Sequence, residues 1–143
     1  MKITWKRCQS YAEAKDYSRI IYLHEWNGQP FYWGKAHESF FGGHKRKTAD
    51  LEASGRYNSG YSHWIEGCLR HGGLLYVGQL DKDALAVIDD VEKYLIVTHG
   101  HVMNKKGTRY NKSLSIEHIG EIPLSIQYTR ATKGSVGQGG HAA

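Results

Sequence analysis

The chain has 143 residues, of which 40% are apolar, so it is long enough for one ordinary domain with a buried core. This composition excludes disordered, coiled-coil and collagen-like chains, and no apolar run approaches the ~18 residues of a membrane span. The first residues lack the apolar region of a signal peptide, and two cysteines, Cys8 and Cys68, cannot form a disulfide framework. We therefore expect a cytoplasmic protein with no membrane attachment.

The charge is unevenly distributed along the chain. The 19 Lys and Arg against 14 Asp and Glu give a net charge of +5. Residues 81–92 hold five acids and one base, so the rest of the chain has 18 bases against 9 acids, a net of +9. A basic body would attract a polyanion, and a compact acidic segment could bind a divalent cation. The alternative is a solvated helix start whose acids complement the helix dipole.

The first predicted element is a β-hairpin. Apolar runs at residues 20–24 and 30–33 flank the dipeptide Asn27-Gly28, which favours a tight hairpin turn. Pro30 has no amide hydrogen, so it fits the start of a strand or a sheet edge. The sequence therefore predicts two paired strands with several aromatic side chains on them.

A helical pattern follows the hairpin. Residues 44–53 predict a short helix with a basic first turn, and residues 55–60 predict a loop. Asn58 or Ser59 then offers an N-cap for a clearer helix, which Gly72-Gly73 ends. The apolar residues of this helix recur at helical spacing on one face: Tyr61, Trp64, Ile65, Cys68 and Leu69. On that face Cys68 is expected to be a small buried hydrophobe.

The rest of the chain predicts three further elements. Residues 74–80 predict a buried strand, residues 85–98 a helix, and residues 122–128 a final half-buried strand, with residues 100–111 forming a loop. The expected fold class is α/β (α+β), with a small, mainly antiparallel central sheet, a β-hairpin at its start and helices packed on it.

The domain organisation follows from composition. Only the last eleven residues are of low complexity, and their four glycines leave almost nothing that could pack in a core. We expect one domain over residues 1–132 and a flexible Gly-rich tail over residues 133–143.

Glu92 is the most informative acid. It lies on a partly apolar helix face, where a carboxylate is costly unless it is paired or binds a metal. The alternative is a boundary glutamate held in an ordinary ion pair. A second metal hypothesis is a ββα-metal nuclease built from polar residues of the later chain: His99, His101, Asn104, Asn111 and His118.

The order of these features resembles the GIY-YIG nuclease family, in its restriction-enzyme-like branch and as a stand-alone domain. Residues 20–22 (IIY), a short turn and residues 32–34 (YWG), followed by Lys35, are similar to the family signature. An arginine, a strand, a helix with a glutamate and an asparagine then follow in the family's order. Ile20 stands where the family has its first glycine, and Trp33 replaces a small aliphatic residue.

The resemblance implies a metal-dependent endonuclease that hydrolyses DNA phosphodiesters. In its terms, Tyr22 or Tyr32 positions or deprotonates the attacking water, and Lys35 lowers the pKa of the tyrosine. Glu92 would hold one Mg²⁺ or Mn²⁺ as cofactor. The remaining roles fall to an arginine that clamps the phosphate, either Arg56 or Arg46, and to a residue that orients phosphate or water, either His63 or Tyr61.

DNA is the expected partner, through contacts that position its backbone without reading its sequence. The residues expected to make these contacts are Lys45, Lys47, Asn104, Lys105, Lys106 and Arg109. In so small an enzyme, specificity would come from a homodimer, from loops 36–60 and 100–120, or from another partner. The alternatives are a non-catalytic nucleic-acid-binding module of the same fold and a small structural protein whose basicity is incidental.

Overall fold

A computed structural model of the chain describes residues 1–42 and 55–127, with the backbone alone for residues 55–60. One five-stranded sheet has the order β3-β2-β4-β1-β5. Neighbouring strands are antiparallel except for the parallel pair β1 and β5, so the predicted α+β class with a mainly antiparallel sheet is confirmed. The strands are β1 (Lys2–Cys8), β2 (Ile20–Trp26), β3 (Gln29–Ala36), β4 (Leu74–Leu80) and β5 (Glu117–Gly120).

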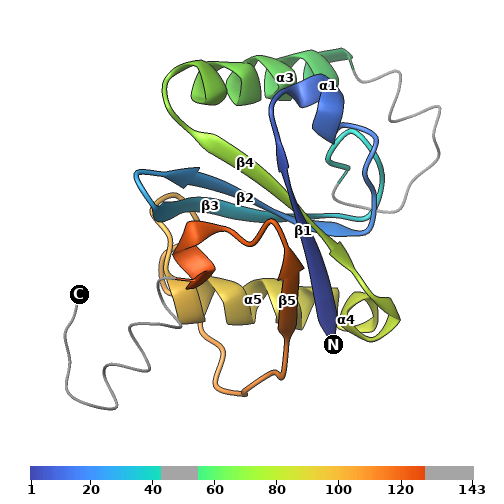
Figure 1. Cartoon of the computed structure of the whole chain (residues 1–143), viewed down its shortest axis with the longest axis vertical. Helices are drawn as coiled ribbons and strands as arrows, with labels where there is room; N and C mark the ends of the chain where they lie inside the picture. The colour runs from blue at the N-terminus through green and yellow to red at the C-terminus, as the bar shows by residue number, and fades with distance from the viewer. Residues whose placement is uncertain (43–54, 128–143) are drawn as a thin grey trace.

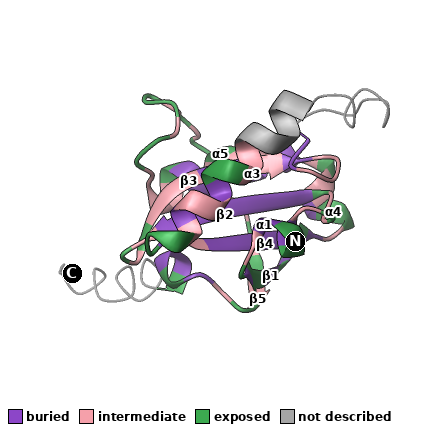
Figure 2. Ribbon diagram, turned by 90° about the horizontal axis from the view of Figure 1, so that it is seen from above, coloured by how far each residue is buried: buried purple, intermediate pink, exposed green. Residues whose placement is uncertain are grey.

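Helices cover both faces of this sheet. On one face lie α1 (Tyr11–Ala14) and α3 (Gly55–Arg70), and on the other lie α4 (Lys82–Ala86) and α5 (Ile88–His99), as Figure 1 shows. The central strands β2 and β4 are mostly buried between these layers, whereas the outer sides of the helices are more exposed (Figure 2). The two faces of the sheet therefore form two separate apolar clusters.

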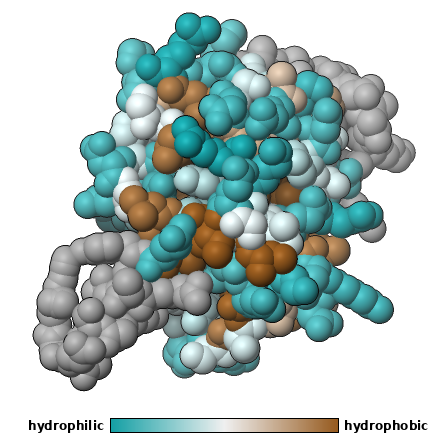
Figure 3. Space-filling view, in the orientation of Figure 1, coloured by the Kyte–Doolittle hydropathy of each residue, from teal (hydrophilic) through white to brown (hydrophobic). Residues whose placement is uncertain are grey.

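The alternation of side chains along the strands decides which cluster each residue joins. Towards α1 and α3 the sheet buries Cys8, Ile20, Tyr22, Ala36, Leu75 and Val77. Towards α4 and α5 it buries Ile3, Trp5, Ile21, Leu23, Trp33, Tyr76 and Leu80. The outer surface in the view of Figure 3 is mainly hydrophilic, with apolar side chains gathered in a band across its middle.

The predicted hairpin is confirmed. Strands β2 and β3 meet at Asn27 and Gly28, whose φ angles of 53° and 75° are left-handed. Both central residues of a type I′ turn need this conformation, and the Asn-Gly pair supplies it at low cost. The register places Tyr22 opposite Gly34 on neighbouring strands.

Two helix predictions need correction. Helix α3 begins at Gly55, so the expected loop at 55–60 and an N-cap at Asn58 or Ser59 are wrong. The single helix expected over 85–98 is two helices that join at Val87, whose φ of −127° and ψ of 41° leave the helical region. The first of them starts earlier than expected because the Asp81 side chain accepts a hydrogen bond from the Ala84 amide.

The C-terminal strand is also wrongly placed in the sequence analysis. Within the described residues the last strand is β5, whereas residues 124–127 form a helical turn in place of the strand expected over 122–128. The carboxylate of Glu25 holds this turn, because it accepts hydrogen bonds from the amide and hydroxyl of Ser125. A buried glutamate on β2 therefore overrides the alternating pattern of the later segment.

Strand β1 has no counterpart in the sequence analysis, although it lies between β4 and β5 in the sheet. Its residues Ile3, Trp5 and Cys8 are buried, while the exposed residues Thr4, Lys6 and Arg7 separate them. The expected helix over 44–53, the domain end at 132 and the tail over 133–143 lie outside the described residues. Among the helices that the structure describes, none combines the length and apolar character that a membrane crossing requires.

Candidate functional site

Tyr22 and Tyr32 lie on the same face of the hairpin, on the side of α3. Their ring centroids are 6.3 Å apart, and Tyr22 also packs edge-on against Phe41 at 4.9 Å. Opposite Tyr22, a Cβ added to Gly34 would lie 2.2 Å from its Cζ and 2.4 Å from its hydroxyl oxygen. The glycine of the YWG segment is therefore required because the Tyr22 ring lies directly over it.

Lys35 and Glu92 form an ion pair at the edge of the sheet. The Nζ of Lys35 is 3.0 Å from Oε1 of Glu92 and 3.5 Å from Oδ1 of Asp89, one helical turn earlier on α5. The Glu92 side chain is 17% exposed, so this pair is partly shielded from water. The sequence prediction of a carboxylate at the margin of a core face is confirmed, and so is the alternative that it is ion-paired.

The charges around Tyr32 act in opposite directions. Burial raises the pKa of Tyr32, the negative charge of Glu92 raises it further, and Lys35 lowers it. Lys35 therefore acts in the expected direction, but burial and Glu92 outweigh it, so the net pKa of Tyr32 is raised. Burial would lower the pKa of Lys35 itself, but its hydrogen bond to Glu92 and the charges of Glu92 and Asp89 outweigh burial and raise it.

The candidate groups are divided between the two faces of β3. Tyr32 lies on the face towards α3, and Lys35 lies on the face towards α5, where it pairs with Glu92. Strand β3 is the edge strand on this side of the sheet, and residues 102–104 form hydrogen bonds to its backbone at Phe31 and Trp33. Lys35 and Glu92 act on the pKa of Tyr32 through their charges.

The carboxylates of Glu92 and Asp89 have the chemistry that Mg²⁺ and Mn²⁺ prefer. Such ions are often held by one or two carboxylates, with water and substrate phosphate completing their coordination. In the described residues no three His, Cys, Asp or Glu side chains converge as a complete protein-only metal site. Glu92 and Asp89 could supply two carboxylates to such an ion, and both are paired with Lys35.

Asn104 has a defined structural position. Its Oδ1 accepts from the Trp33 amide at 2.8 Å, and its Nδ2 donates to the Trp33 carbonyl at 2.7 Å. The amides of Val102 and Met103 also donate to the carbonyl of Phe31. The side chain of Asn104 thus takes the place of a neighbouring strand along this edge, which fits a supporting position beside Tyr32 more directly than a DNA contact.

The other candidate residues are placed in part. Lys105, Lys106 and Arg109 are exposed in the loop after Asn104, and His63 is exposed on α3. The first two basic candidates, Lys45 and Lys47, and the candidate arginine Arg46 lie outside the described residues. Arg56 is the second residue of α3, and the structure describes only its backbone.

The histidines of the alternative ββα-metal hypothesis take up packing positions. The ring of His99 lies 5.9 Å from that of Trp33 and 6.4 Å from that of His118. The Nδ1 of His118 accepts from the indole of Trp5 at 2.9 Å. Loop residues 100–111 carry no strand or helix, so the compact hairpin and helix of that hypothesis are not formed.

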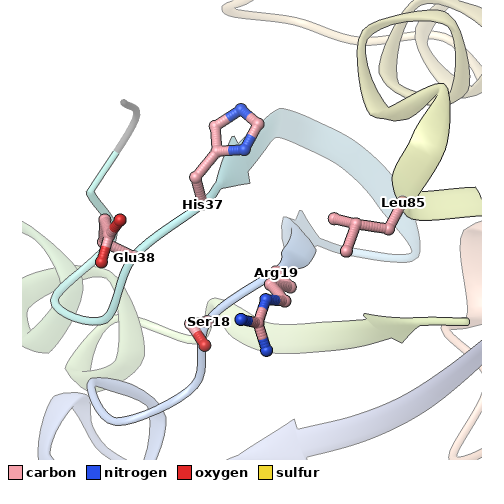
Figure 4. A pocket seen from close by; sticks show the side chains of 5 residues that line it. All are labelled: Ser18, Arg19, His37, Glu38 and Leu85. Atoms are coloured by element: carbon pink, nitrogen blue, oxygen red, sulfur yellow. The ribbon is translucent and has the colours of Figure 1, made fainter. Parts of the chain in front are cut away.

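Sequence reasoning missed two features, one at the start of β2 and one within it. Arg19, which directly precedes β2, lines a pocket of about 250 Å³ with Ser18, His37, Glu38 and Leu85. Figure 4 shows Arg19 and Ser18 at the base of β2 and Leu85 reaching in from α4. A guanidinium beside the IIY segment was visible in the sequence, and the left-handed φ of 57° at Arg19 was not.

The second missed feature is His24, which is only 2% exposed. It lies two residues after Tyr22 on the same face of β2 and is surrounded by the rings of Tyr22, Tyr32, Tyr61 and Trp64. Burial lowers its pKa to about 3, so the ring is neutral at physiological pH. The single polar residue in an apolar run was its only sequence signal.

Comparisons with family models, with curated proteins and with solved structures find no match for this chain.

Proposed function

We propose that the chain is a divalent-metal-dependent DNA endonuclease of the GIY-YIG type. The observation that carries this proposal is that the hairpin holds Tyr22 beside Tyr32 on one face and Lys35 paired with Glu92 on the other. Their order in the sequence is the order expected from the resemblance. A net positive charge and an exposed basic loop next to Asn104 supply the attraction to DNA.

Phosphodiester hydrolysis needs an oriented water, neutralised phosphoryl oxygens and a stabilised leaving oxygen. The phenol of Tyr32 is neutral at physiological pH because its pKa is raised, so it can hold a water by hydrogen bonding. Lys35 brings a positive charge to the same edge, where it would neutralise part of the phosphate charge. Tyr22 is held in place by its packing over Gly34.

Glu92, with Asp89 beside it, would hold the Mg²⁺ or Mn²⁺ ion. A bound ion supplies charge neutralisation at the phosphoryl and leaving oxygens. Because Lys35 occupies Oε1 of Glu92, the ammonium must share that carboxylate or move towards the phosphate when DNA binds. The arginine that completes the phosphate clamp remains a choice between Arg56 and Arg46.

A plasmid-nicking assay tests the proposal. We expect nicking in Mg²⁺ that EDTA abolishes, with Glu92→Gln reducing it by at least a hundredfold. Glu117→Gln is the matched control, because this exposed glutamate on β5 lies outside the candidate site and should leave nicking unchanged. Nicking by Glu92→Gln at the rate of the unaltered chain would refute the assigned role of Glu92.

The ion pair between Lys35 and Glu92 also favours the second candidate, a non-catalytic nucleic-acid-binding module of the same fold. An ion pair of this kind needs no metal. Salt-dependent DNA binding without nicking in Mg²⁺ or Mn²⁺, on supercoiled and linear DNA, would establish the module and exclude the enzyme. Substituting Arg46 and Arg56 singly with Lys identifies the clamp, because lysine cannot make the bidentate phosphate contact.

A further inference from the structure

An aromatic pocket lies beside the candidate site on the α3 side of the sheet. It encloses about 340 Å³, and its described lining consists of Tyr32, Tyr61, Trp64 and Met103. Small-molecule pockets span roughly 300–1,000 Å³, so this one suits a single flat ring system better than a larger ligand. The lining is mainly apolar and comes from β3, α3 and the loop after α5.

The walls of this pocket are arranged for stacking. The rings of Tyr61 and Trp64 are parallel within 11°, with centroids 5.7 Å apart. Trp64 is 39% exposed and Met103 is 60% exposed, although both are large hydrophobic side chains. Tryptophan and methionine at the mouth of a pocket offer a polarisable surface to a flat partner.

A buried polar ring packs against the walls of this pocket, although it is not part of the described lining. The ring of His24 contacts three of the four lining residues, with its centroid 4.5 Å from that of Trp64. Its Nε2 is buried without a hydrogen-bond partner in the part of the chain that the structure describes. A buried nitrogen of this kind is costly to leave unpaired, so the occupant should present a polar edge as well as a flat face.

We propose that this pocket binds one unpaired nucleobase of a DNA strand whose backbone Lys35 would contact. The proposal rests on the proposed function, because Tyr32 belongs both to the pocket and to the candidate site. A nucleobase is flat and has hydrogen-bonding edges, and the strand that carries it is attracted by the exposed Lys105 and Lys106 that follow Met103. Such a pocket would direct cleavage to unpaired or flipped-out positions.

Binding measurements in EDTA test the pocket without relying on cleavage. The probe is a labelled DNA duplex with one unpaired base in a bulge, compared by anisotropy with the same bulge made abasic. We expect the unaltered protein to bind the base-containing duplex roughly 5- to 150-fold more tightly, the range that base stacking on an aromatic side chain supports. Equal affinity for the two duplexes would overturn the proposal.

Variants locate the effect. Trp64→Ala should remove most of the preference for the base-containing bulge, and Met103→Ala, at a more exposed position, should reduce it without a risk to folding. Val97→Ala is the control, because this residue of α5 is 45% exposed and is absent from the described lining. Full preference in both pocket variants would refute the assigned site.

Two further experiments test the role of His24 and the source of the bound base. His24→Phe keeps the ring and removes its nitrogens, so it should flatten the ranking among bulged A, C, G and T. An unchanged ranking would refute the contact to His24. Free deoxyadenosine that binds as tightly as the bulged duplex would assign the pocket to nucleosides and overturn the DNA assignment.

The outcomes for the pocket and for the nuclease are distinguishable. A preference for the base-containing bulge without nicking would support the pocket and refute the enzyme. Nicking without that preference would support the enzyme and refute the pocket.

Discussion

The pair of hydrogen bonds between Asn104 and the backbone of Trp33 offers a quantitative test of how the candidate site is supported. Asn104→Ala removes both bonds and leaves a partly buried N–H and C=O of Trp33 without their partner. Each neutral hydrogen bond contributes about 0.5–1.5 kcal/mol, so the free energy of unfolding should fall by roughly 1–3 kcal/mol. With a urea m-value of about 1–3 kcal/mol/M, the unfolding midpoint should fall by roughly 1 M.

Two other variants sharpen this test. Asn111→Ala makes the same change at an exposed position of the same loop and should leave the midpoint unchanged. Asn104→Asp keeps the acceptor for the Trp33 amide but sets a carboxylate oxygen against the Trp33 carbonyl. We expect it to be at least as unstable as Asn104→Ala at pH 7 and to recover relative to the unaltered chain as the pH falls towards ~4, where a carboxyl group becomes a donor. If Asn104→Asp matches the unaltered chain at pH 7, the inferred hydrogen bonding is incorrect.

Three further predictions concern other contacts. Gly34→Ala should displace the Tyr22 ring and lower nicking by at least tenfold, since its Cβ would lie 2.2 Å from that ring; undiminished nicking would contradict a role for Tyr22. Ser125→Ala should lower the free energy of unfolding by about 1.5–3 kcal/mol, as measured by urea titration, because its hydroxyl bonds the buried Glu25 carboxylate. Burial holds the pKa of His24 at about 3 in the folded state, against about 6.5 in the unfolded chain. Because the unfolded chain takes up a proton below pH 6.5, the free energy of unfolding should be unaffected above this pH and should fall by at most about 1.4 kcal/mol per pH unit below it. His24→Phe should remove that part of the acid sensitivity in unfolding experiments between pH 4 and 7.

The hairpin and the α3 and α5 helices were predictable because their signals are local. Asn27-Gly28 determines the turn, and the spacing of apolar residues along α3 and α5 determines which sides face the sheet. Strand β1 was missed because its pairing partners, β4 and β5, are distant in the sequence. The expected strand at 122–128 failed because its conformation depends on a buried glutamate about 100 residues earlier.

The candidate site was predictable in its composition and only partly in its geometry. The order of Tyr22, Tyr32, Lys35 and Glu92 was visible in the sequence, but their electrostatic balance was not. The sign of the pKa shift of Tyr32 depends on how deeply the phenol is buried and on how closely Glu92 approaches it. The pocket beside Trp64 was also hidden, because Tyr61 and Trp64 belong to an apolar helix face that the sequence assigns to the core, and Tyr32 and Met103 come from distant segments.

The strand order has a consequence for how the chain folds during synthesis. Strand β1 is made first, yet its antiparallel partner β4 ends only at Leu80, and its parallel partner β5 is made later still. The hairpin can form early, because β2 and β3 are close together in the sequence. The centre of the sheet can form only after β4 has been made, because β4 lies between β1 and β2. Until then the apolar residues of β1 have no partner strand. We therefore expect a chain that is stalled on the ribosome before residue 74 to bind chaperones strongly. A chain that is stalled after residue 120 has emerged from the ribosome should bind them more weakly.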